Sequence, residues 1–380
     1  MIDKKYKIVY CTPALYMAGG VERVLTLKAN YFAEHYDYEV TIILTEGKDK
    51  PCAYNLSDKV KLINLDINFE ELWECSFIKK IFLYLKKQRI YKRKLKAELM
   101  RIRPDITDSL LRREINFLTK IKDGSVKIGE LHVNRLNYRN FEANDSNLIK
   151  ALFSRFWMFS LIRHLKRLNR FVVLTEEDKE NWPELHNVIA IPNPISFNTD
   201  CVSRLDNKRV LAVGRYAYQK GYDMLLKAWA IVEDKCPEWE LNIYGQGNRE
   251  PYDKIAKDLR LKNCHLNGSV SNINEKYLDS SVFVVSSRFE GLSMSLLEAM
   301  SFGLAVVSFD CPCGFRDVIT SGVNGVLVPK DSVESLAEQI VVVLQNSDYI
   351  VELGKNARVR SQDFRLEVLA EKWKQLFESL

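Results

Sequence analysis

Residues 282–300 read VFVVSSRFEGLSMSLLEAM, and this stretch decides the fold. Its first five residues are typical of a buried strand, a glycine turn follows at Gly291, and a helical pattern begins near Met294. A buried strand that leads through a glycine turn into a helix is one unit of a parallel α/β sheet. We therefore expect the same alternation of strands and helices on both sides of this stretch.

The alternation extends over most of the chain. In the second half, further strands are predicted at 209–213, 239–244, 305–309 and 326–328. In the first half, strands are predicted at 7–10, 40–44, 106–110, 126–131, 171–174 and 188–191. Residues 195–207 between the two series are polar and aperiodic, which is typical of a linker. The sequence thus predicts an α/β protein with two doubly wound Rossmann-like domains, over 1–195 and 196–360.

Doubly wound sheets bind ligands beyond the carboxyl ends of their strands. We expect the two domains to face each other across a cleft, and that cleft is the default position for a site.

Composition limits the classes of function. The chain has 380 residues, of which 47% are hydrophobic and 28% charged, and this excludes disordered, collagen-like and coiled-coil proteins. The eight cysteines form no CxxC pair and predict reduced thiols in a cytoplasmic protein. No signal-peptide cleavage pattern follows the first residues. The longest apolar run, near 156–162, is far below the ~18 residues of a membrane span, so a soluble protein is expected.

Two glycine turns suggest sites where a backbone approaches a ligand. Gly19-Gly20 follows the first predicted strand and opens a helix, where free amides can bind an anion. The alternative is a simple tight turn. Gly245 and Gly247 lack the third glycine of a dinucleotide motif, because Glu250 stands at that position, and the chain contains no P-loop.

Two cations follow the first strand of the second domain. Arg215 and Lys220 lie five residues apart at the carboxyl end of that strand, where they can hold a diphosphate. The alternative is a solvated loop, since most lysines and arginines lie at the surface.

Two glutamates flank the glycine turn of 282–300. Glu290 precedes the predicted helix, and a carboxylate there suits the hydroxyl groups of a sugar or ribose. Glu298 follows Ser295 by three residues, which also spells a capping box, in which the glutamate binds its own helix start. Both interpretations of Glu298 remain open at this point.

Taken together, these motifs resemble the family-four retaining glycosyltransferases of the GT-B fold, of the type found in bacterial capsular and exopolysaccharide synthesis. The matching elements are Gly19-Gly20-x-Glu22-Arg23, Pro192-Asn193-Pro194, Gly214-Arg215-x₄-Lys220-Gly221, Tyr244-Gly245-x-Gly247, Glu290-x₇-Glu298 and Asn324-Gly325-x-Leu327-Val328. The resemblance is strong over about 186–330, weaker over 1–45 and thin over 46–170.

The resemblance implies a role for each matching residue. Arg215, Lys220, Gly19 and Gly20 would bind the donor diphosphate, and His132 and Glu290 would be the catalytic residues near the donor sugar. The donor sugar and nucleotide would be bound at Asn193, Gly245, Gly247, Gly291, Leu292, Ser293 and Glu298. Leu292-Ser293 replaces the family's usual Phe-Gly. For His132, a satisfied core histidine is the alternative. The family pattern also implies that a helix over 361–380 packs back on the first domain.

The activity so implied is transfer of a hexose or N-acetylhexosamine from a UDP-linked sugar to a glycan or lipid-linked glycan, with retention at the anomeric carbon. No DxD motif is present, so we expect neither a metal nor a cofactor, and Arg215, Lys220 and helix N-termini would stabilise the leaving group. The alternatives are a nucleotide-sugar epimerase of the same architecture and a basic nucleic-acid-binding protein. No recognised nucleic-acid module supports the second alternative.

The net charge of +6 conceals one strongly basic segment. Residues 79–96 hold nine basic residues and no acidic one, and Ile78, Ile81, Phe82 and Leu85 lie on one helical face. Residues 155–167 repeat the combination of cations and aromatic side chains. We expect 78–96 and 155–167 to bind the anionic lipids on the inner face of the cell membrane. The alternative is that they form a solvated helix face.

Overall fold

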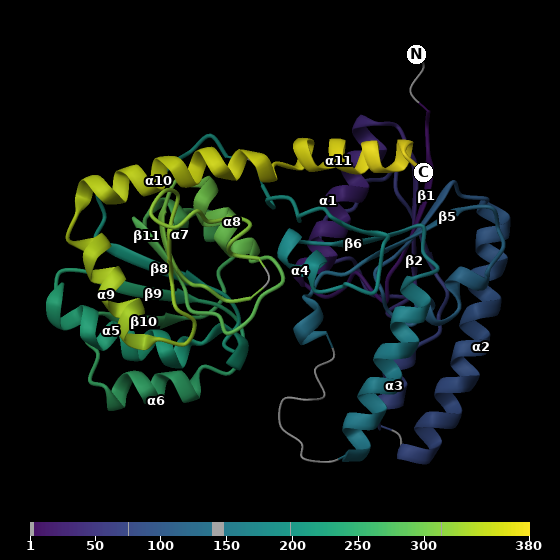
Figure 1. Ribbon diagram of the computed structural model, residues 1–380, viewed down its shortest axis with the longest axis horizontal. Coiled ribbons are helices and arrows are strands. Elements are labelled where there is room, and N and C mark those ends of the chain that lie inside the picture. The colour runs from purple at the N-terminus through teal and green to yellow at the C-terminus, as the bar shows by residue number, and fades with distance from the viewer. Residues whose placement is uncertain (1–3, 75, 139–147, 198, 313) are drawn as a thin grey trace. The chain divides into compact units, whose positions relative to one another are not determined.

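The computed structural model describes residues 4–74, 76–138, 148–197, 199–312 and 314–380 (Figure 1). The chain divides into two compact units. The first unit comprises Met1–Pro192 and Leu366–Leu380, and the second comprises Asn193–Arg365.

The first unit contains a seven-stranded parallel sheet in the order β3-β2-β1-β4-β5-β6-β7. Its strands are β1 (Lys7–Cys11), β2 (Glu39–Leu44), β3 (Lys61–Asn64), β4 (Ile106–Ser109), β5 (Val126–Glu130), β6 (Arg170–Val173) and β7 (Val188–Ala190). Apart from the edge strands β3 and β7 the strands are largely buried, as expected for a sheet covered on both faces.

Helices cover this sheet and extend beyond it. They are α1 (Gly20–His35), α2 (Phe77–Ile102), α3 (Leu148–Leu165), α4 (Glu176–Glu180) and α11 (Leu366–Glu378). The C-terminal helix α11 belongs to this unit and packs on α1, where the Phe377 ring lies 5.6 Å from the Phe32 ring. Two short 3-10 helices, Glu114–Asn116 and Leu118–Lys120, follow β4.

The second unit contains a six-stranded parallel sheet in the order β10-β9-β8-β11-β12-β13. Its strands are β8 (Arg209–Val213), β9 (Glu240–Tyr244), β10 (Cys264–Asn267), β11 (Val282–Val285), β12 (Ala305–Phe309) and β13 (Val326–Val328). Its helices are α5 (Tyr222–Lys235), α6 (Glu250–Asp258), α7 (Ile273–Leu278), α8 (Met294–Ser301), α9 (Val333–Leu344) and α10 (Ser347–Ser361).

The predicted fold class is confirmed: both units are α/β and doubly wound. Every strand predicted from the sequence is present within one or two residues, but β3 and β10 were not predicted. Both are edge strands with polar and half-exposed residues, so they lack the continuous apolar run that marks a central strand.

The basic segment of the first unit forms α2, and its apolar residues are exposed. Ile81, Phe82 and Leu85 on α2 and Phe156 and Phe159 on α3 are each about half exposed or more. The side chain of Ile78 lies outside the described residues. Within the described part of the chain, no helix is long and apolar enough to cross a membrane.

Candidate functional site

The order of the second sheet marks one position where a ligand is expected. β8 and β11 are neighbours, and the chain continues from them toward opposite edges, through β9 and β10 on one side and β12 and β13 on the other. In doubly wound sheets the ligand lies at such a reversal, beyond the carboxyl ends of the two strands. The loops that follow the two strands, 214–221 and 286–293, contain six of the predicted site residues: Arg215, Lys220, Glu290, Gly291, Leu292 and Ser293.

The two loops are bound directly to each other. The backbone amide of Arg288 donates to the carbonyl of Gln219 at 2.8 Å, and the Ser286 hydroxyl donates to the carbonyl of Lys220 at 2.9 Å. A Cβ at Gly221, where φ is +64°, would lie 2.1 Å from the carbonyl oxygen of Ser286. Only glycine allows this approach without strain.

Glu290 lies at the centre of this junction and is only 8% exposed. Its Oε1 accepts hydrogen bonds from Lys220 Nζ at 2.7 Å and from the Ser287 hydroxyl at 2.8 Å. Its Oε2 accepts one from Gln219 Nε2 at 3.3 Å. The two residues that the sequence assigned to diphosphate and sugar, Lys220 and Glu290, are therefore in direct contact.

A second ion pair, between Arg288 of the β11 loop and Asp223 of α5, also holds the two loops together. Arg288 donates to both carboxylate oxygens of Asp223 at 2.8 and 2.7 Å, and its guanidinium lies 4.0 Å from the centre of the Tyr218 ring. Burial raises the pKa of Asp223, but the hydrogen bonds and charge of Arg288 outweigh burial and hold the pKa below its usual range. Asp223 is therefore ionised at neutral pH, and the clamp is intact.

Arg215 differs from Lys220 in its surroundings. Its side chain is exposed and has no hydrogen bond or ion pair with any residue that the structure describes. An exposed guanidinium at a strand end is available to an anionic ligand.

The structure bears on the capping-box interpretation of Glu298. The N-cap of α8 is Ser293 rather than Ser295, and it makes no side-chain capping bond. Glu298 is buried, and its Oε2 accepts a hydrogen bond from the Tyr277 hydroxyl at 2.9 Å. The capping-box alternative is therefore wrong, because Ser295 already lies inside the first turn of the helix.

The start of α8 has the properties of an anion site. Gly291, Leu292 and Ser293 lead into the helix, and Leu292 and Ser293 are buried. The first amides of any helix have no partner within it, and the helix dipole favours negative charge there. α8 follows β11, so these amides belong to the same carboxyl-end edge of the sheet.

The glycines after β9 have backbone reasons to be glycine. A Cβ at Gly245 would lie 1.8 Å from the carbonyl oxygen of Gly214, so the loops after β8 and β9 touch. Gly247 has φ +119°, a conformation that strains other residues, and pairs with Tyr216 in a backbone bridge. Both glycines hold the shape of the loop that carries Arg215.

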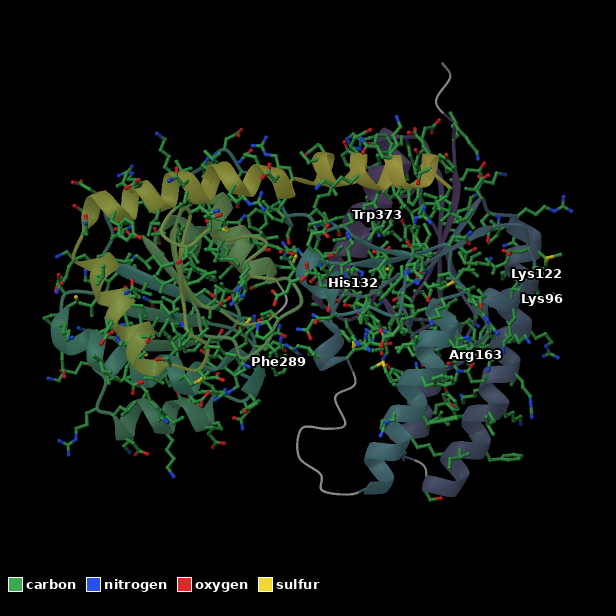
Figure 2. The ribbon with its side chains drawn as sticks, in the orientation of Figure 1. Lys96, Lys122, His132, Arg163, Phe289 and Trp373 are labelled. Atoms are coloured by element: carbon green, nitrogen blue, oxygen red, sulfur yellow. The ribbon has the colours of Figure 1, made fainter. Side chains whose placement is uncertain are left out.

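In the first unit, His132 follows β5 (labelled in Figure 2). Its side chain belongs to a buried polar cluster with Glu130 and Lys28. Its Nε2 lies 3.3 Å from Oε2 of Glu130, whose Oε1 forms an ion pair with Lys28 on α1. Burial raises the pKa of Glu130, but Lys28 and His132 lower it well below its usual range. Nδ1 of His132 is buried without a partner among the described residues. The alternative of a fully satisfied core histidine is therefore not supported.

Asp108 on β4 completes this cluster. Burial and the charge of Glu130 raise the pKa of its carboxyl well above the usual range. No described donor reaches either of its oxygens. Asp108 is thus held in the protonated form.

The remaining predicted positions are separate from these clusters. Gly19 is the N-cap of α1, and a Cβ at Gly20 would meet no atom within 4 Å, so packing does not require glycine there. Asn193 is buried where the chain enters the second unit.

Several residues of these clusters were missed by the sequence prediction. They are Lys28, Asp108, Glu130, Asp223, Tyr277, Ser287 and Arg288. Lys28 had a usable signal, because it shares the buried face of a helix with Leu25 and Phe32, where a lysine requires a carboxylate partner. Tyr277 and Arg288 had none, since their partners depend on tertiary structure.

Comparison with known proteins agrees with this geometry. Residues 200–360, which contain both loops and α8, match the family of glycosyl transferases group 1. This part of the chain belongs to the glycosyl transferases group 1.

Two relatives are similar to this chain over different shares of its length. An uncharacterized glycosyltransferase of Haemophilus influenzae is 31% identical over 212 residues, and the match spans 54% of this chain and 60% of that relative's length. An alpha-1,4-N-acetyl-D-galactosaminyltransferase of Campylobacter jejuni, whose name includes a PP-undecaprenol-linked glycan, is 27% identical over 94% of this chain and 95% of its own length.

Among solved structures, TarM of S. aureus, determined with UDP bound, superposes with a TM-score of 0.74 at 17% sequence identity. The match covers 98% of this chain and 99% of TarM. The likeness establishes the GT-B fold.

Proposed function

We propose that this protein is a retaining α-glycosyltransferase that transfers a hexose or N-acetylhexosamine from a UDP-linked sugar. The observation that carries the proposal is the junction of the β8 and β11 loops, where Lys220 binds Glu290. Arg215 belongs to the first of these loops, and α8 begins at the end of the second. Cations and free amides suit a diphosphate, and a buried carboxylate suits sugar hydroxyls. UDP bound to TarM supports the choice of nucleotide.

In the proposed reaction the bond between the anomeric carbon and the β-phosphate oxygen breaks as an acceptor hydroxyl bonds to that carbon on the same face. The acceptor proton passes to the departing phosphate. Arg215, Lys220 and the α8 amides stabilise the negative charge of the leaving diphosphate, and Glu290 orients the sugar. Because these charges come from the protein, we propose that no metal is needed.

The acceptor in this proposal is a glycan or lipid-linked glycan of a cell-surface polysaccharide. The PP-undecaprenol-linked glycan in the name of the Campylobacter relative supports an acceptor of this class. We also propose that the enzyme works at an anionic membrane. The exposed apolar residues of α2 and α3 lie among basic side chains, which is the pattern of a membrane-binding surface.

Two of the basic residues in the proposed membrane surface have polar partners within their own unit. Lys87 donates to the carbonyls of Ile67 and Asn68 at 2.6 and 2.7 Å, and Lys94 donates to the carbonyl of Leu65 at 2.5 Å. These two of the nine basic residues are bound to their own unit, so they do not contribute to a membrane surface.

A donor screen tests the proposed activity. The purified protein is incubated with a panel of nucleotide sugars and a lipid-linked acceptor, with and without EDTA, and nucleoside diphosphate and glycan products are measured. We expect diphosphate release and an α-linked product from one UDP-sugar at equal rates in both buffers. A free isomerised sugar nucleotide without diphosphate release would indicate an epimerase instead. Sedimentation with anionic and neutral vesicles at low and high salt tests the membrane proposal, and absence of salt-sensitive binding would refute it.

A further inference from the structure

A groove of about 670 Å³ lies between α2 and α3 in the first unit. Figure 1 shows the two helices running beside each other, and the chain after β4 forms part of the groove wall. Its apolar lining consists of Leu85, Ile115, Phe117, Phe156, Trp157 and Leu161. A cavity of this size and polarity is typical of a binding site for a small amphiphile.

Four cations share this lining: Arg89, Lys92, Arg112 and Arg113. Among the residues that the structure describes, no acidic side chain lines the groove. Arg89, Lys92 and Arg112 are exposed, and their side chains have no hydrogen bond or ion pair among the described residues. Arg113 lies 3.8 Å from Glu46 and over the Phe69 ring.

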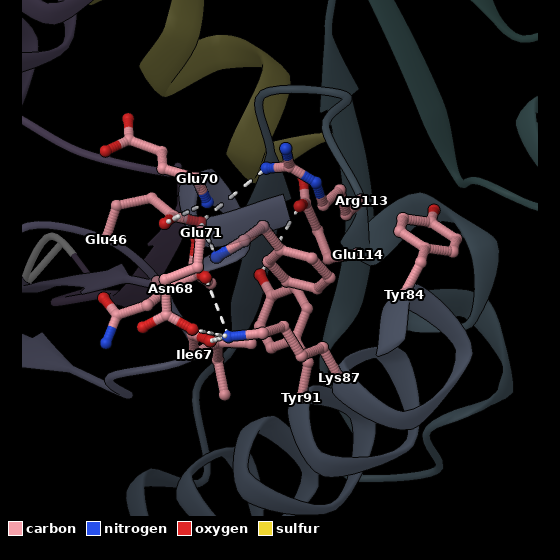
Figure 3. Close-up of polar contacts among 12 residues, drawn as sticks. Glu46, Ile67, Asn68, Glu70, Glu71, Tyr84, Lys87, Tyr91, Arg113 and Glu114 are labelled. Carbon is pink, nitrogen blue, oxygen red and sulfur yellow. Dashed lines mark hydrogen bonds and ion pairs between the residues drawn. The ribbon is translucent and has the colours of Figure 1, made fainter. Parts of the chain in front are cut away.

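The basic residues of α2 differ in whether their side chains have polar partners. Lys87, on a different face of the helix, has three polar contacts to the segment 67–71, as Figure 3 shows. Arg89 and Lys92 line the groove and have no such contacts. Lysine and arginine side chains gathered around an apolar cavity without acidic partners create a positive potential that an anion would neutralise.

The groove also offers a polar atom and an exposed apolar edge. Oε1 of Gln88 is buried in the lining and has no donor among the described residues. Phe156, at the groove, is 71% exposed, and Phe82, one turn before the groove residues of α2, is 72% exposed. Such exposed aromatic side chains mark an interaction surface.

From this juxtaposition we propose that the groove binds a single long-chain isoprenyl or alkyl phosphate or diphosphate. The chain lies against Leu85, Phe156 and Trp157, and the phosphate is bound by Arg89, Lys92 and Arg112. The site rests on the proposed function, for which it supplies the lipid-phosphate part of the acceptor. Arg112 lies three residues after the end of β4, and β4 borders β1 at the reversal of strand order in the first sheet. The phosphate therefore lies at the edge where such sheets bind ligands.

Farnesyl diphosphate at submicellar concentration is a soluble probe of this site. Titration is followed by calorimetry and by tryptophan fluorescence, since Trp157 lies in the lining. We expect saturable binding with one site per chain, and much weaker binding of farnesol, which lacks the anion, and of inorganic diphosphate, which lacks the chain. Equal binding of inorganic diphosphate and farnesyl diphosphate would overturn the proposal.

Two double variants that remove the same charge distinguish binding in the groove from general attraction to a basic surface. Arg89→Ala/Lys92→Ala removes two groove cations, and Arg93→Ala/Lys96→Ala removes two exposed cations of the same helix that do not line the groove. We expect the first pair to weaken farnesyl diphosphate binding at least about tenfold and the second to have little effect. Equal weakening by both pairs would show a general electrostatic surface and overturn the site.

A third variant, Phe156→Ala, tests the apolar part. It should weaken farnesyl diphosphate binding while leaving the weak binding of inorganic diphosphate unchanged, and unchanged binding of both would contradict the assigned chain position. Thermal unfolding of each variant verifies the fold. Titration of the wild-type protein with UDP is a separate readout: absence of UDP binding would refute the proposed function, whereas absence of farnesyl diphosphate binding alone would refute the groove.

Discussion

The ammonium group of Lys220 lies 2.7 Å from Oε1 of Glu290, and the two residues come from different loops of the second unit. Without a ligand, the cation proposed to bind the donor diphosphate is thus held by the carboxylate proposed to bind the donor sugar. The contact fixes the position of the Lys220 ammonium group at the carboxyl end of the strands. It also means that a diphosphate must share Lys220 with Glu290.

This sharing predicts opposite effects of Glu290→Gln on binding and turnover. The amide removes a negative charge beside the diphosphate, so the affinity for UDP should stay equal or rise. Turnover of the UDP-sugar should fall by about a hundredfold or more, because the sugar loses a carboxylate acceptor. Calorimetry with UDP and initial rates of transfer measure the two quantities.

Glu238→Gln is the matched control, since Glu238 is exposed and distant in sequence from both loops. It should change neither quantity. Loss of UDP affinity in Glu290→Gln equal to its loss of turnover would contradict the assignment of Glu290 to the sugar.

The Tyr277–Glu298 contact leads to a prediction about UDP affinity, because Glu298 is proposed to bind the ribose of the donor. If Glu298 binds the donor ribose as proposed, Glu298→Gln replaces a carboxylate acceptor of its hydroxyls with an amide. Tyr277→Phe removes the donor that lies 2.9 Å from that carboxylate. We expect Glu298→Gln to weaken UDP binding by about tenfold or more and Tyr277→Phe to weaken it less, since bonds to charged groups contribute about 1.5–3 kcal/mol. Binding of inorganic diphosphate should not change. Equal losses for UDP and inorganic diphosphate would argue against a ribose contact.

Substitution of His132 distinguishes a catalytic role of this residue from a role in packing the core. If the imidazole acts near the donor sugar, His132→Gln should lower turnover by about a hundredfold while the midpoint of thermal unfolding changes little. A residue that only packs would show the reverse, with full turnover and a lowered midpoint. Unfolding and transfer are therefore measured on the same preparation.

The raised pKa of Asp108 predicts a pH dependence of stability. In the unfolded chain this carboxyl ionises above its ordinary pKa, whereas in the folded protein burial and Glu130 keep it protonated. The unfolded state then binds fewer protons, so this group lowers the free energy of unfolding as pH rises, by up to about 1.4 kcal/mol per pH unit, until the folded pKa is reached.

Asp108→Asn cannot ionise and should lose this dependence. Chemical unfolding between about pH 4.5 and 8 should show the variant gaining stability relative to the wild type as pH rises. Parallel profiles for the two proteins would mean that Asp108 is not held protonated in the folded state.

Most of the fold could be predicted from the sequence because central parallel strands are apolar throughout. β8 and β11 were predicted almost to the residue, since both of their faces are buried. The edge strands β3 and β10 could not be, because one side of each meets solvent and their residues lack that pattern.

A site residue could be predicted only where its own stretch of sequence also indicated its place in the fold. Lys220 and Glu290 stand in glycine-containing loops after strands, so their position at the sheet edge follows from the pattern. Their contact with each other, the Arg288–Asp223 clamp and the cluster of Lys28, Glu130 and Asp108 join segments that are distant in sequence. The groove beside α2 could not be predicted either, because the sequence does not show which lysines of that helix have polar partners and which have none.

The most direct test of the central claim is the affinity for UDP of the wild-type protein and of Lys220→Ala, measured by calorimetry. Lys227→Ala on the exposed face of α5 is the matched control. If Lys220 binds the donor diphosphate, its loss should weaken UDP binding by about tenfold or more with an unchanged thermal midpoint, while the control retains wild-type affinity. Equal UDP affinity in all three proteins would contradict the assignment of this junction as the donor site.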